Sequence, residues 1–302
     1  MHTLDGVILF PLPAYERLAG ALERLTPLDR GRFSITRFSN GELHATLDTT
    51  VAAQACLVLG SVAPPDENLL STLLLSHTLA KEGAGRITAL LPYLGYARHE
   101  KDEPRKSLGT AWMGDLLRAS GVSDVLSVDV HSRLVHTRVP IPLRSLSPAG
   151  IFADALTSIG LRDATLVAPD EGALERCEAV RRLAGIERPL VHLTKKRTDA
   201  GVVHSTLHGI VGSSAVIVDD ILDTGGTLVS ACEALRCAGV EAIIVMVTHG
   251  LFTGTQWQRL GPLGVSRIYC TDTVPLPRLP ATPLIEVLPV APLLSTHLDD
   301  PA

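Results

Sequence analysis

The amino-acid sequence predicts an α/β protein made of two tandem halves, each with a mostly parallel sheet flanked by helices. Short aliphatic runs alternate along the chain with amphipathic segments of helix length. The runs are mostly apolar, without strict alternation of polar and apolar residues, which is typical of strands that helices cover on both faces. At 302 residues the chain also exceeds the usual size of one hydrophobic core.

The expected strands are short β-branched or aliphatic runs, and the expected helices lie between them. The strands are Gly6–Phe10, Cys56–Gly60, Ile87–Leu91, Val125–Val130, Thr165–Ala168, Leu190–Leu193, Ala215–Val218 and Ile243–Thr248. The helices are Ala14–Leu25, Glu67–Glu82, Thr110–Ser120, Ala149–Ser158, Glu171–Leu183 and Thr227–Ala238. Several of these helices end near a glycine, such as Gly83, Gly121 or Gly239, which is typical of a helix C-terminus.

A segment with several prolines, Pro140–Pro148, separates the two sets of elements. We therefore expect an N-terminal domain over residues 1–145 and a C-terminal domain over residues 146–290. Residues 291–302 are expected to form a tail, which from Leu293 onward is expected to fray.

The composition restricts the partners and the compartment. The formal net charge of -5 argues against a basic surface that binds nucleic acid, so we expect a small-molecule partner and local recognition of any phosphate. Five cysteines with no C-x-x-C pair indicate reduced thiols and no zinc site. Asp5 follows no basic N-terminal segment, and apolar runs such as Ala242–Val247 are too short to cross a bilayer. We expect a soluble, cytoplasmic protein that binds no membrane.

The clearest chemical signal follows the apolar run Ala215–Val218, where two acids, Asp219 and Asp220, precede a turn and a helical pattern. The turn consists of Asp223, Thr224, Gly225, Gly226 and Thr227. Glycines let the backbone turn tightly, and N–H groups and hydroxyls at a helix N-terminus favour an anion. We therefore expect a phosphate in this loop. The two acids, at the C-terminal end of a strand, are placed to accept hydrogen bonds from vicinal sugar hydroxyls.

A simpler interpretation is that Asp223 only caps the helix and that the glycines only form a turn. The segment is not a Walker phosphate loop, because no Gly-Lys-Ser/Thr follows, and it contains no G-x-G-x-x-G. By itself, the loop is therefore consistent with many transferases.

The segment Val216–Thr227 resembles the phosphoribosyl pyrophosphate loop of the type I phosphoribosyltransferase fold. Five further segments resemble, in order and spacing, the ribose-phosphate pyrophosphokinase (phosphoribosyl pyrophosphate synthetase) family. They are Arg37–Glu42, Pro92–Arg98, Val128–His131, Ala168–Asp170 and Lys195–Arg197. The resemblance covers about residues 5–290 and implies two tandem phosphoribosyltransferase-like domains, the first on the ATP side and the second on the ribose 5-phosphate side. It implies transfer of the β,γ-pyrophosphoryl group of ATP to the 1-hydroxyl of D-ribose 5-phosphate, with release of AMP.

The resemblance also implies roles for four residues of the reacting centre. Lys195 and Arg197 follow an expected strand and precede an expected loop, and as the catalytic pair they would neutralise charge on the transferring group. His131 and Asp170 each lie just past a strand, and they would hold Mg²⁺, which keeps several positions for water and phosphate oxygens. Taken alone, the basic residues would be interpreted as a solvated turn. The histidine alone would be an ordinary interfacial residue as readily as a metal ligand.

On the ATP side, Arg98 and His99 correspond to residues that hold the phosphates and the adenine. Phe38, Asn40 and Glu42 correspond to an adenine-binding loop contributed by a neighbouring subunit. A homodimer or a larger homo-oligomer is therefore implied. Without the resemblance, this stretch would be interpreted as a hairpin turn made by Asn-Gly.

The chain departs from the family at several positions. Asn40 replaces the more usual aspartate, and His99–Glu100 replaces Gln-Asp. Gly172–Ala173 stands where the family usually has two adjacent glycines in a turn that receives pyrophosphate. The segment Lys101–Gly109 replaces a longer, more basic loop that carries phosphate activation and ADP inhibition. We therefore expect weak allosteric control. The changes at Asn40 and His99–Glu100 leave the choice of nucleotide donor open.

Two other interpretations stay open. A phosphoribosyltransferase with a nucleobase acceptor would use the loop at Asp219–Thr227, but it would account for only one half of the chain. A catalytically silent, nucleotide-binding paralogue that regulates a synthetase would account for the departures at Asn40 and His99. It would have no reason to retain Lys195 and Arg197.

Overall fold

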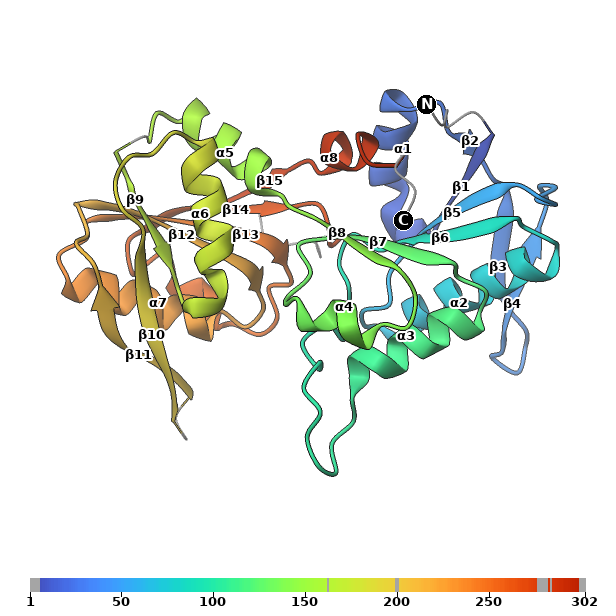
Figure 1. The fold of residues 1–302 in the computed structure, drawn as a ribbon, viewed down its shortest axis with the longest axis horizontal. Coiled ribbons are helices and arrows are strands. Elements are labelled where there is room, and N and C mark those ends of the chain that lie inside the picture. The colour runs from blue at the N-terminus through green and yellow to red at the C-terminus, as the bar shows by residue number, and fades with distance from the viewer. Residues whose placement is uncertain (1–5, 162, 199–200, 276–281, 283, 299–302) are drawn as a thin grey trace. The chain divides into compact units, whose positions relative to one another are not determined.

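The computed structural model describes residues 6–161, 163–198, 201–275, 282 and 284–298, except for the side chains of residues 195–198 and 201–205. The chain forms two compact units (Figure 1). Unit 1 contains Met1–Leu146 and Ala291–Ala302, and unit 2 contains Ser147–Val290. The division lies within the proline-containing segment, and the C-terminal end of the chain belongs to the first unit.

Unit 1 is built on a six-stranded parallel sheet in the order β2-β1-β5-β6-β7-β8. Its strands are β1 (Val7–Pro11), β2 (Asp29–Arg30), β5 (Ala55–Leu59), β6 (Arg86–Leu90), β7 (Asp124–Val128) and β8 (Leu143–Leu146). A separate antiparallel hairpin consists of β3 (Phe33–Arg37) and β4 (Leu43–Leu47). The helices are α1 (Glu16–Leu25), α2 (Asp66–Lys81), α3 (Gly109–Ala119), α4 (Leu134–Arg138) and α8 (Ala291–Ser295), with a 3-10 turn η1 (Pro13–Tyr15) before α1.

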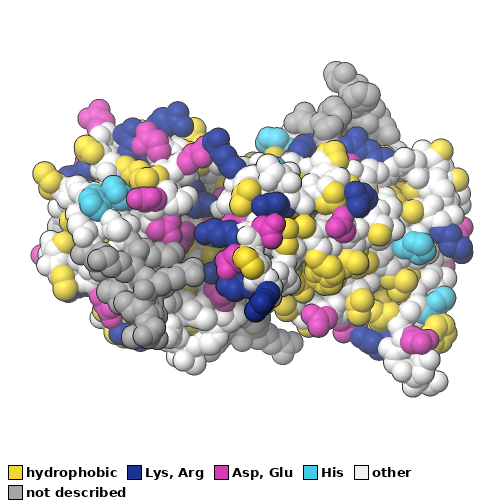
Figure 2. All heavy atoms as spheres, turned by 60° about the horizontal axis from the view of Figure 1, so that its bottom comes forward, with side chains coloured by type: hydrophobic (Ala, Val, Ile, Leu, Met, Phe, Trp, Pro, Cys, Tyr) yellow, Lys and Arg dark blue, Asp and Glu magenta, His cyan; other side chains and the backbone are white. Residues whose placement is uncertain are grey.

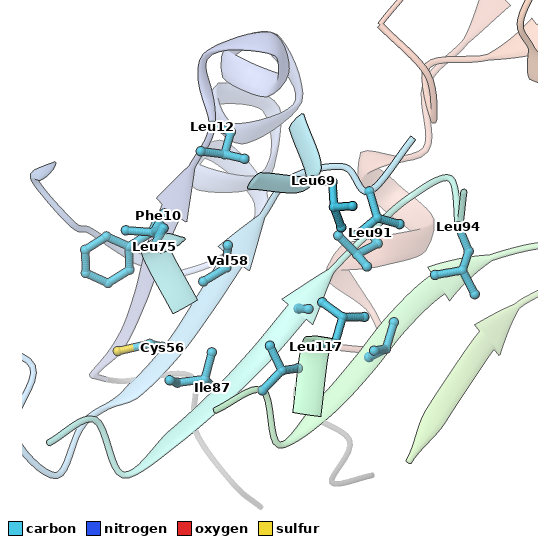
Figure 3. Close-up of a cluster of buried hydrophobic side chains, with 14 of the residues drawn as sticks. Phe10, Leu12, Cys56, Val58, Leu69, Leu75, Ile87, Leu91, Leu94 and Leu117 are labelled. Atoms are coloured by element: carbon cyan, nitrogen blue, oxygen red, sulfur yellow. The ribbon is translucent and has the colours of Figure 1, made fainter. Parts of the chain in front are cut away.

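The central strands of unit 1 are buried on both faces, as their mostly apolar sequences predict. Phe10, Val58 and Ile87 lie on one face, where they pack with Leu75 of α2 and Leu117 of α3 in one core (Figure 3). Helices α1 and α8 lie on the opposite face of the sheet (Figure 1). The order of strands places the ends of β6 and β7, and the segments that follow them, at one edge of the sheet.

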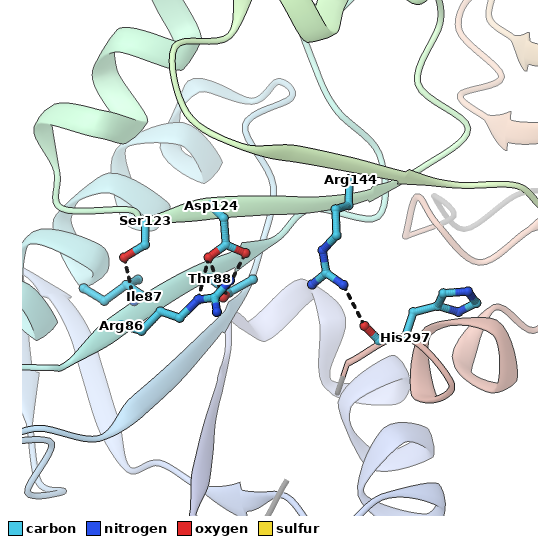
Figure 4. Close-up of polar contacts among 7 residues, drawn as sticks. All are labelled: Arg86, Ile87, Thr88, Ser123, Asp124, Arg144 and His297. Atoms are coloured by element: carbon cyan, nitrogen blue, oxygen red, sulfur yellow. Dashed lines mark hydrogen bonds and ion pairs between the residues drawn. The ribbon is translucent and has the colours of Figure 1, made fainter. Parts of the chain in front are cut away.

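Two polar contacts fix elements of unit 1 that are distant in sequence (Figure 4). The buried carboxylate of Asp124 on β7 accepts hydrogen bonds from Arg86 Nε at 2.8 Å and from the Thr88 hydroxyl, both on β6. Arg144 on β8 donates from Nη1 to the carbonyl of His297 at 3.0 Å. The first contact ties two neighbouring strands together, and the second holds the C-terminal segment against the sheet.

Unit 2 is built on a seven-stranded sheet in the order β11-β10-β9-β12-β13-β14-β15. The strands are β9 (Thr165–Ala168), β10 (Val191–Thr198), β11 (Gly201–His208), β12 (Ser214–Leu222), β13 (Ala242–Gly250), β14 (Val265–Thr271) and β15 (Ile285–Leu288). The helices are α5 (Ala149–Ser158), α6 (Leu174–Leu183) and α7 (Gly226–Cys237), and the 3-10 turns are η2 (Glu171–Ala173) and η3 (Gln256–Arg259). All neighbouring strands are parallel except β10 and β11, which form an antiparallel hairpin.

Alternation along β12 divides the core of unit 2 into two layers. Ala215 and Ile217 face the layer that contains α7, whereas Val216 and Val218 face the layer that contains α5 and α6. A strand buried on both faces has no room for water along its length, so its first polar residues come where the apolar contacts end. On β12 that position is Asp219, and the strand continues to Leu222 before the turn that leads into α7.

The expected elements are present in the structure within a few residues, with two corrections. Lys195–Arg197 is expected after the end of a strand, but these residues lie within one. The strand β10 continues to Thr198 and pairs there with β11. The segment from Leu293 does not begin a frayed tail, because α8 is helical and Leu294 is fully buried. Within the described residues, no helix combines the length and the apolar character needed to span a membrane.

Candidate functional site

The loop between β12 and α7 has a conformation that only glycine satisfies. Gly225 precedes the first residue of α7 and has a φ of +93°, in the left-handed region. A Cβ atom on Gly225 would lie 2.6 Å from Cα of Trp257 and 2.8 Å from its N atom. The loop is thus held between the end of β12 and the backbone of η3, with no space for a side chain at residue 225.

The first turn of α7 presents free hydrogen-bond donors. The N–H of Val229 is the first in the helix to donate within the chain, to the carbonyl of Gly225 at 2.8 Å. Within the described part of the chain, the N–H groups of Gly226, Thr227 and Leu228 donate to no acceptor. The Asp223 side chain therefore does not cap the helix, so that part of the simpler interpretation is wrong. Three unpaired N–H groups at the positive end of a twelve-residue helix form a cradle for an anion.

Asp223 instead joins the loop to the segment after β13. The N–H of Thr253 donates to the carbonyl of Asp223 at 3.1 Å, and the Thr253 hydroxyl donates to its Oδ1 atom. Sequence reasoning missed this segment. The available signal was the parallel pairing of β12 with β13, because the loops that follow two neighbouring parallel strands lie at the same edge of the sheet.

Asp219 and Asp220 are the last acids of β12 before the loop, and both are buried. Asp219 Oδ1 accepts the N–H of Asp220 at 2.9 Å. Burial raises the pKa of Asp219 well above its ordinary value, the charge of Asp220 raises it further, and the positive charge of Arg176 opposes the change. Two buried carboxylates that repel each other are stabilised by donors such as sugar hydroxyls, or by a cation.

Asp170 lies just past β9, the strand that pairs with β12 on the side opposite β13. Its Oδ1 atom accepts the N–H of Ala173 at 3.2 Å, so the side chain begins the turn η2. The charges of Asp170 and Arg176 both act on Asp219. Unit 2 therefore brings Asp170, Asp219 and the anion cradle to one edge of its sheet.

The backbone of Lys195 and Arg197 lies in β10, opposite His204 and Val202 of β11. Their side chains lie outside the described part of the structure. The pairing of the two strands shifts between Thr194 and Lys195, which indicates a bulge at the start of the basic segment. β10 is the neighbour of β9, so the basic residues extend beyond the end of the strand that leads to Asp170.

In unit 1, Arg98 and His99 lie at the end of a turn that follows β6, and both are exposed. The N–H of His99 donates to the carbonyl of Tyr96 at 3.0 Å, and the His99 carbonyl accepts the N–H of Thr110 at 3.3 Å. The Thr110 hydroxyl donates to the carbonyl of Tyr96 at 2.7 Å. These bonds fix the turn against the start of α3 and leave both predicted ATP-binding side chains at the surface.

Phe38, Asn40 and Glu42 lie in the turn between β3 and β4, so the Asn-Gly hairpin is present. The Asn40 Oδ1 atom accepts the N–H of Glu42 at 3.2 Å, which tightens the turn. Phe38 is 55% exposed, and its ring centroid lies 5.1 Å from that of His44. An exposed aromatic ring beside polar side chains at the tip of a hairpin is suited to stacking on a ligand or on another chain.

His131 is exposed and belongs to unit 1, beyond the end of β7, whereas Asp170 belongs to unit 2. The chain turns between β7 and His131 at Asp129, which has a φ of +47°. In the part of the chain that is described, no three or more His, Cys, Asp or Glu residues group in a way that could hold a metal ion. The Asp170 carboxylate is an oxygen ligand of the kind that Mg²⁺ takes, and this ion keeps water and phosphate oxygens as further ligands.

Charge on the face shown in Figure 2 is mixed. Lys and Arg side chains stand among Asp and Glu side chains over the described part of this face, without a broad basic patch (Figure 2). The formal net charge of -5 agrees with this view. Binding of an anion therefore depends on local donors, such as those at the start of α7, rather than on a general field.

Known proteins match this chain in both of its units. Residues 7–121 match the N-terminal domain of ribose phosphate pyrophosphokinase, and residues 145–259 match the phosphoribosyl transferase domain. The ribose-phosphate pyrophosphokinase of Campylobacter jejuni is 28% identical over 95% of this chain and 94% of its own. That of Chromobacterium violaceum is 28% identical over 99% and 92%. A crystal structure of phosphoribosylpyrophosphate synthetase from Mycobacterium smegmatis has a TM-score of 0.86 and 28% identity, over 96% of this chain and 97% of that one.

The fold and the two matched domains define a protein with two phosphoribosyltransferase-like domains in tandem, which confirms the predicted fold class. The similarity to relatives extends over nearly the whole chain and includes both halves. The chain belongs to the ribose-phosphate pyrophosphokinase family.

Proposed function

We propose that this protein transfers the β,γ-pyrophosphoryl group of ATP to the 1-hydroxyl of D-ribose 5-phosphate, giving phosphoribosyl pyrophosphate and AMP. The observation that carries the proposal is the open cradle of N–H donors at Gly226–Leu228, directly after the buried acids of β12. A cradle for a phosphate beside two acceptors for hydroxyls matches the two ends of ribose 5-phosphate. The family relationship supplies the reaction.

In unit 2, the 5-phosphate binds the N–H groups and hydroxyls of Thr224–Thr227, with Asp223 held in place by Thr253. The ribose hydroxyls donate to the carboxylates of Asp219 and Asp220. Because these carboxylates are buried and repel each other, they gain more from such donors than exposed acids would. Binding the sugar at both ends fixes the position of its 1-hydroxyl.

In unit 1, Arg98 and His99 bind the phosphates and the adenine of ATP from the exposed turn after β6. The hairpin tip with Phe38, Asn40 and Glu42 serves the adenine of a neighbouring copy of the chain, so the protein works as a homodimer or a larger homo-oligomer. The exposure of Phe38 supports this role, because the ring has an open face to offer. Asn40 is oriented by its bond to the N–H of Glu42.

Lys195 and Arg197 neutralise the charge that develops on the transferring group. Pyrophosphoryl transfer needs positioning and positive charge more than it needs a nucleophilic side chain. His131 and Asp170 would hold Mg²⁺, which when bound lowers the electrostatic cost of bringing the polyanionic substrates together. Asp170 is already oriented for this by the N–H of Ala173.

The five cysteines are free thiols, which fits a reducing compartment. The cytoplasm is the compartment that we propose for this reaction.

The test is to mix the purified protein with ATP, Mg²⁺ and ribose 5-phosphate and to follow the products by ³¹P NMR. We expect equal amounts of AMP and phosphoribosyl pyrophosphate, and no AMP without ribose 5-phosphate. Formation of ADP would contradict transfer of pyrophosphate. If nucleotide binding were retained and no AMP appeared, the chain would instead be a silent paralogue.

A further inference from the structure

The segment after β13 covers one side of the anion cradle. Thr253 is bound to Asp223 by two hydrogen bonds, and the backbone of Trp257 lies against Gly225. Trp257 itself is buried and packs edge to face on Phe252, with ring centroids 5.2 Å apart. The segment is therefore anchored in the core at Trp257 and fixed to the loop at Thr253.

Gln256 lies between these two anchors and is exposed. Its Oε1 atom lies 3.0 Å from the point that a Cβ of Gly226 would occupy, and the Thr224 hydroxyl lies 3.9 Å from the same point. Gly226 is the first residue of α7 and one of the three with an unpaired N–H. Among the described residues, the Gln256 side chain has no hydrogen-bond partner. An unpaired amide thus lies at the entrance of an anion cradle.

We propose that Gln256 is a specificity residue for the phosphorylated substrate, and that its side-chain amide donates a hydrogen bond to the 5-phosphate held at Gly226–Leu228. This inference rests on the function proposed above. An amide has two N–H donors beside its oxygen, and rotation by half a turn about the last side-chain bond presents them to the anion. The Gln256 amide would then donate to the phosphate together with the N–H groups of the helix. Because an unphosphorylated sugar cannot make this contact, the amide favours the phosphate ester.

Gln256→Glu tests the role of the amide. Glutamate has nearly the same shape, but its carboxylate repels a phosphate and cannot donate. The variant is expected to fold, because a negative charge near a helix N-terminus is favourable. Gln258→Glu is the matched control, because Gln258 lies on the same turn, is also exposed, and makes the same change of charge.

The experiment is calorimetric titration of the wild-type protein and both variants with ribose 5-phosphate, and then with ribose. We expect Gln256→Glu to weaken binding of ribose 5-phosphate about tenfold or more, and Gln258→Glu by less than about twofold. Gln256→Ala should give an intermediate loss. The melting temperature of Gln256→Glu should equal or exceed that of the wild-type protein.

The inference is overturned if Gln256→Glu binds ribose 5-phosphate as tightly as the wild-type protein, or if Gln258→Glu loses as much affinity. Either result would leave the proposed function intact, because the wild-type protein would still bind the sugar phosphate. Failure of the wild-type protein to bind ribose 5-phosphate in preference to ribose would overturn the proposed function and this inference together.

Discussion

The N–H of Asp220 donates to the Oδ1 atom of Asp219 at 2.9 Å, and both carboxyl groups are buried at the end of β12. Burial raises the pKa of Asp219, and the charge of Asp220 raises it further. A carboxyl group whose pKa is raised in the folded state contributes stability at pH values below its pKa in the unfolded state, which is about 3.9 for aspartate. That stability is lost as the pH rises through the folded pKa. At neutral pH the substrate-free protein is therefore less stable than it would be with a neutral side chain at residue 219.

We accordingly predict that Asp219→Asn raises the melting temperature at pH 7 by a few degrees, about 2–4 °C for each kcal/mol gained, and weakens binding of ribose 5-phosphate. The gain should disappear near pH 4, where the wild-type carboxyl is protonated. Scanning calorimetry in the presence of a chelator measures the melting temperature at both pH values. The same scans with added ribose 5-phosphate measure the loss of binding. Asp163→Asn, at an exposed position of the same unit, should change neither property. A lower melting temperature for Asp219→Asn at pH 7 would contradict the argument.

Gly225→Ala should weaken the affinity for ribose 5-phosphate by about a hundredfold or more. The residue has a φ of +93°, and an added Cβ would lie 2.6 Å from Cα of Trp257, so the loop must move. Gly239→Ala is the control, because Gly239 has a φ of +88° and no atom within 4 Å of the added Cβ. That variant should lose about 1 kcal/mol of stability from backbone strain and should bind normally. Equal affinities in the two variants would show that the fit of the loop against Trp257 is unimportant.

The core of the fold and one half of the site are readable from the sequence because both depend on local pattern. The run Ala215–Val218 is apolar on both faces, and the acids and glycines after it indicate that a polar turn is near, although β12 itself continues to Leu222. By contrast, β14 (Val265–Thr271) has Ser266 and Arg267 exposed near its start, and its pairing with β13 is irregular. Neither an apolar run nor strict alternation identifies such a strand.

The features of the structure that the sequence did not predict depend on contacts between residues that are distant in the chain, which a local sequence pattern does not contain. The helix α8 has only five residues, and its segment is held by the bond from Arg144 to the carbonyl of His297. The strand β10 continues through Lys195–Arg197 because β11 pairs with it, although charged residues suggest a loop. In the same way, the bonds of Thr253 to Asp223 follow from the neighbouring positions of β12 and β13 and not from either sequence.

Lys195→Ala should reduce kcat by about a thousandfold or more and leave the KM values for ATP and ribose 5-phosphate within a few-fold of the wild-type values. The reason is that its charge is proposed to act on the transition state more strongly than on the bound substrates. Initial rates of AMP formation at varied concentrations of each substrate separate the two effects. Lys81→Ala, at an exposed position on α2, should behave as wild type. Near-normal kcat in Lys195→Ala would remove this residue from the mechanism.

Inorganic phosphate should have little activating effect on this protein. The segment Lys101–Gly109 is short, mostly exposed and of mixed charge, and its Lys106 is already paired with Glu103. It therefore offers few free cations to bind a regulatory anion. Initial rates measured over a wide range of phosphate concentrations should change by less than about twofold, apart from the general effect of ionic strength, which a chloride series controls. A strong sigmoidal activation would show that a phosphate site exists.

Asp124→Ala should destabilise unit 1 by about 3 kcal/mol, because the buried carboxylate pairs with Arg86 and also accepts from Thr88. Its removal leaves the Thr88 hydroxyl and part of the guanidinium without their partner between two strands. Asp115→Ala removes the partner of Arg118 from an exposed pair on α3 and should cost less than about 1 kcal/mol. Urea denaturation measures both changes. The activity per folded molecule should stay normal in both variants, because neither residue belongs to the candidate site, and a similar loss of stability in the two would mean that burial does not strengthen the Asp124 network.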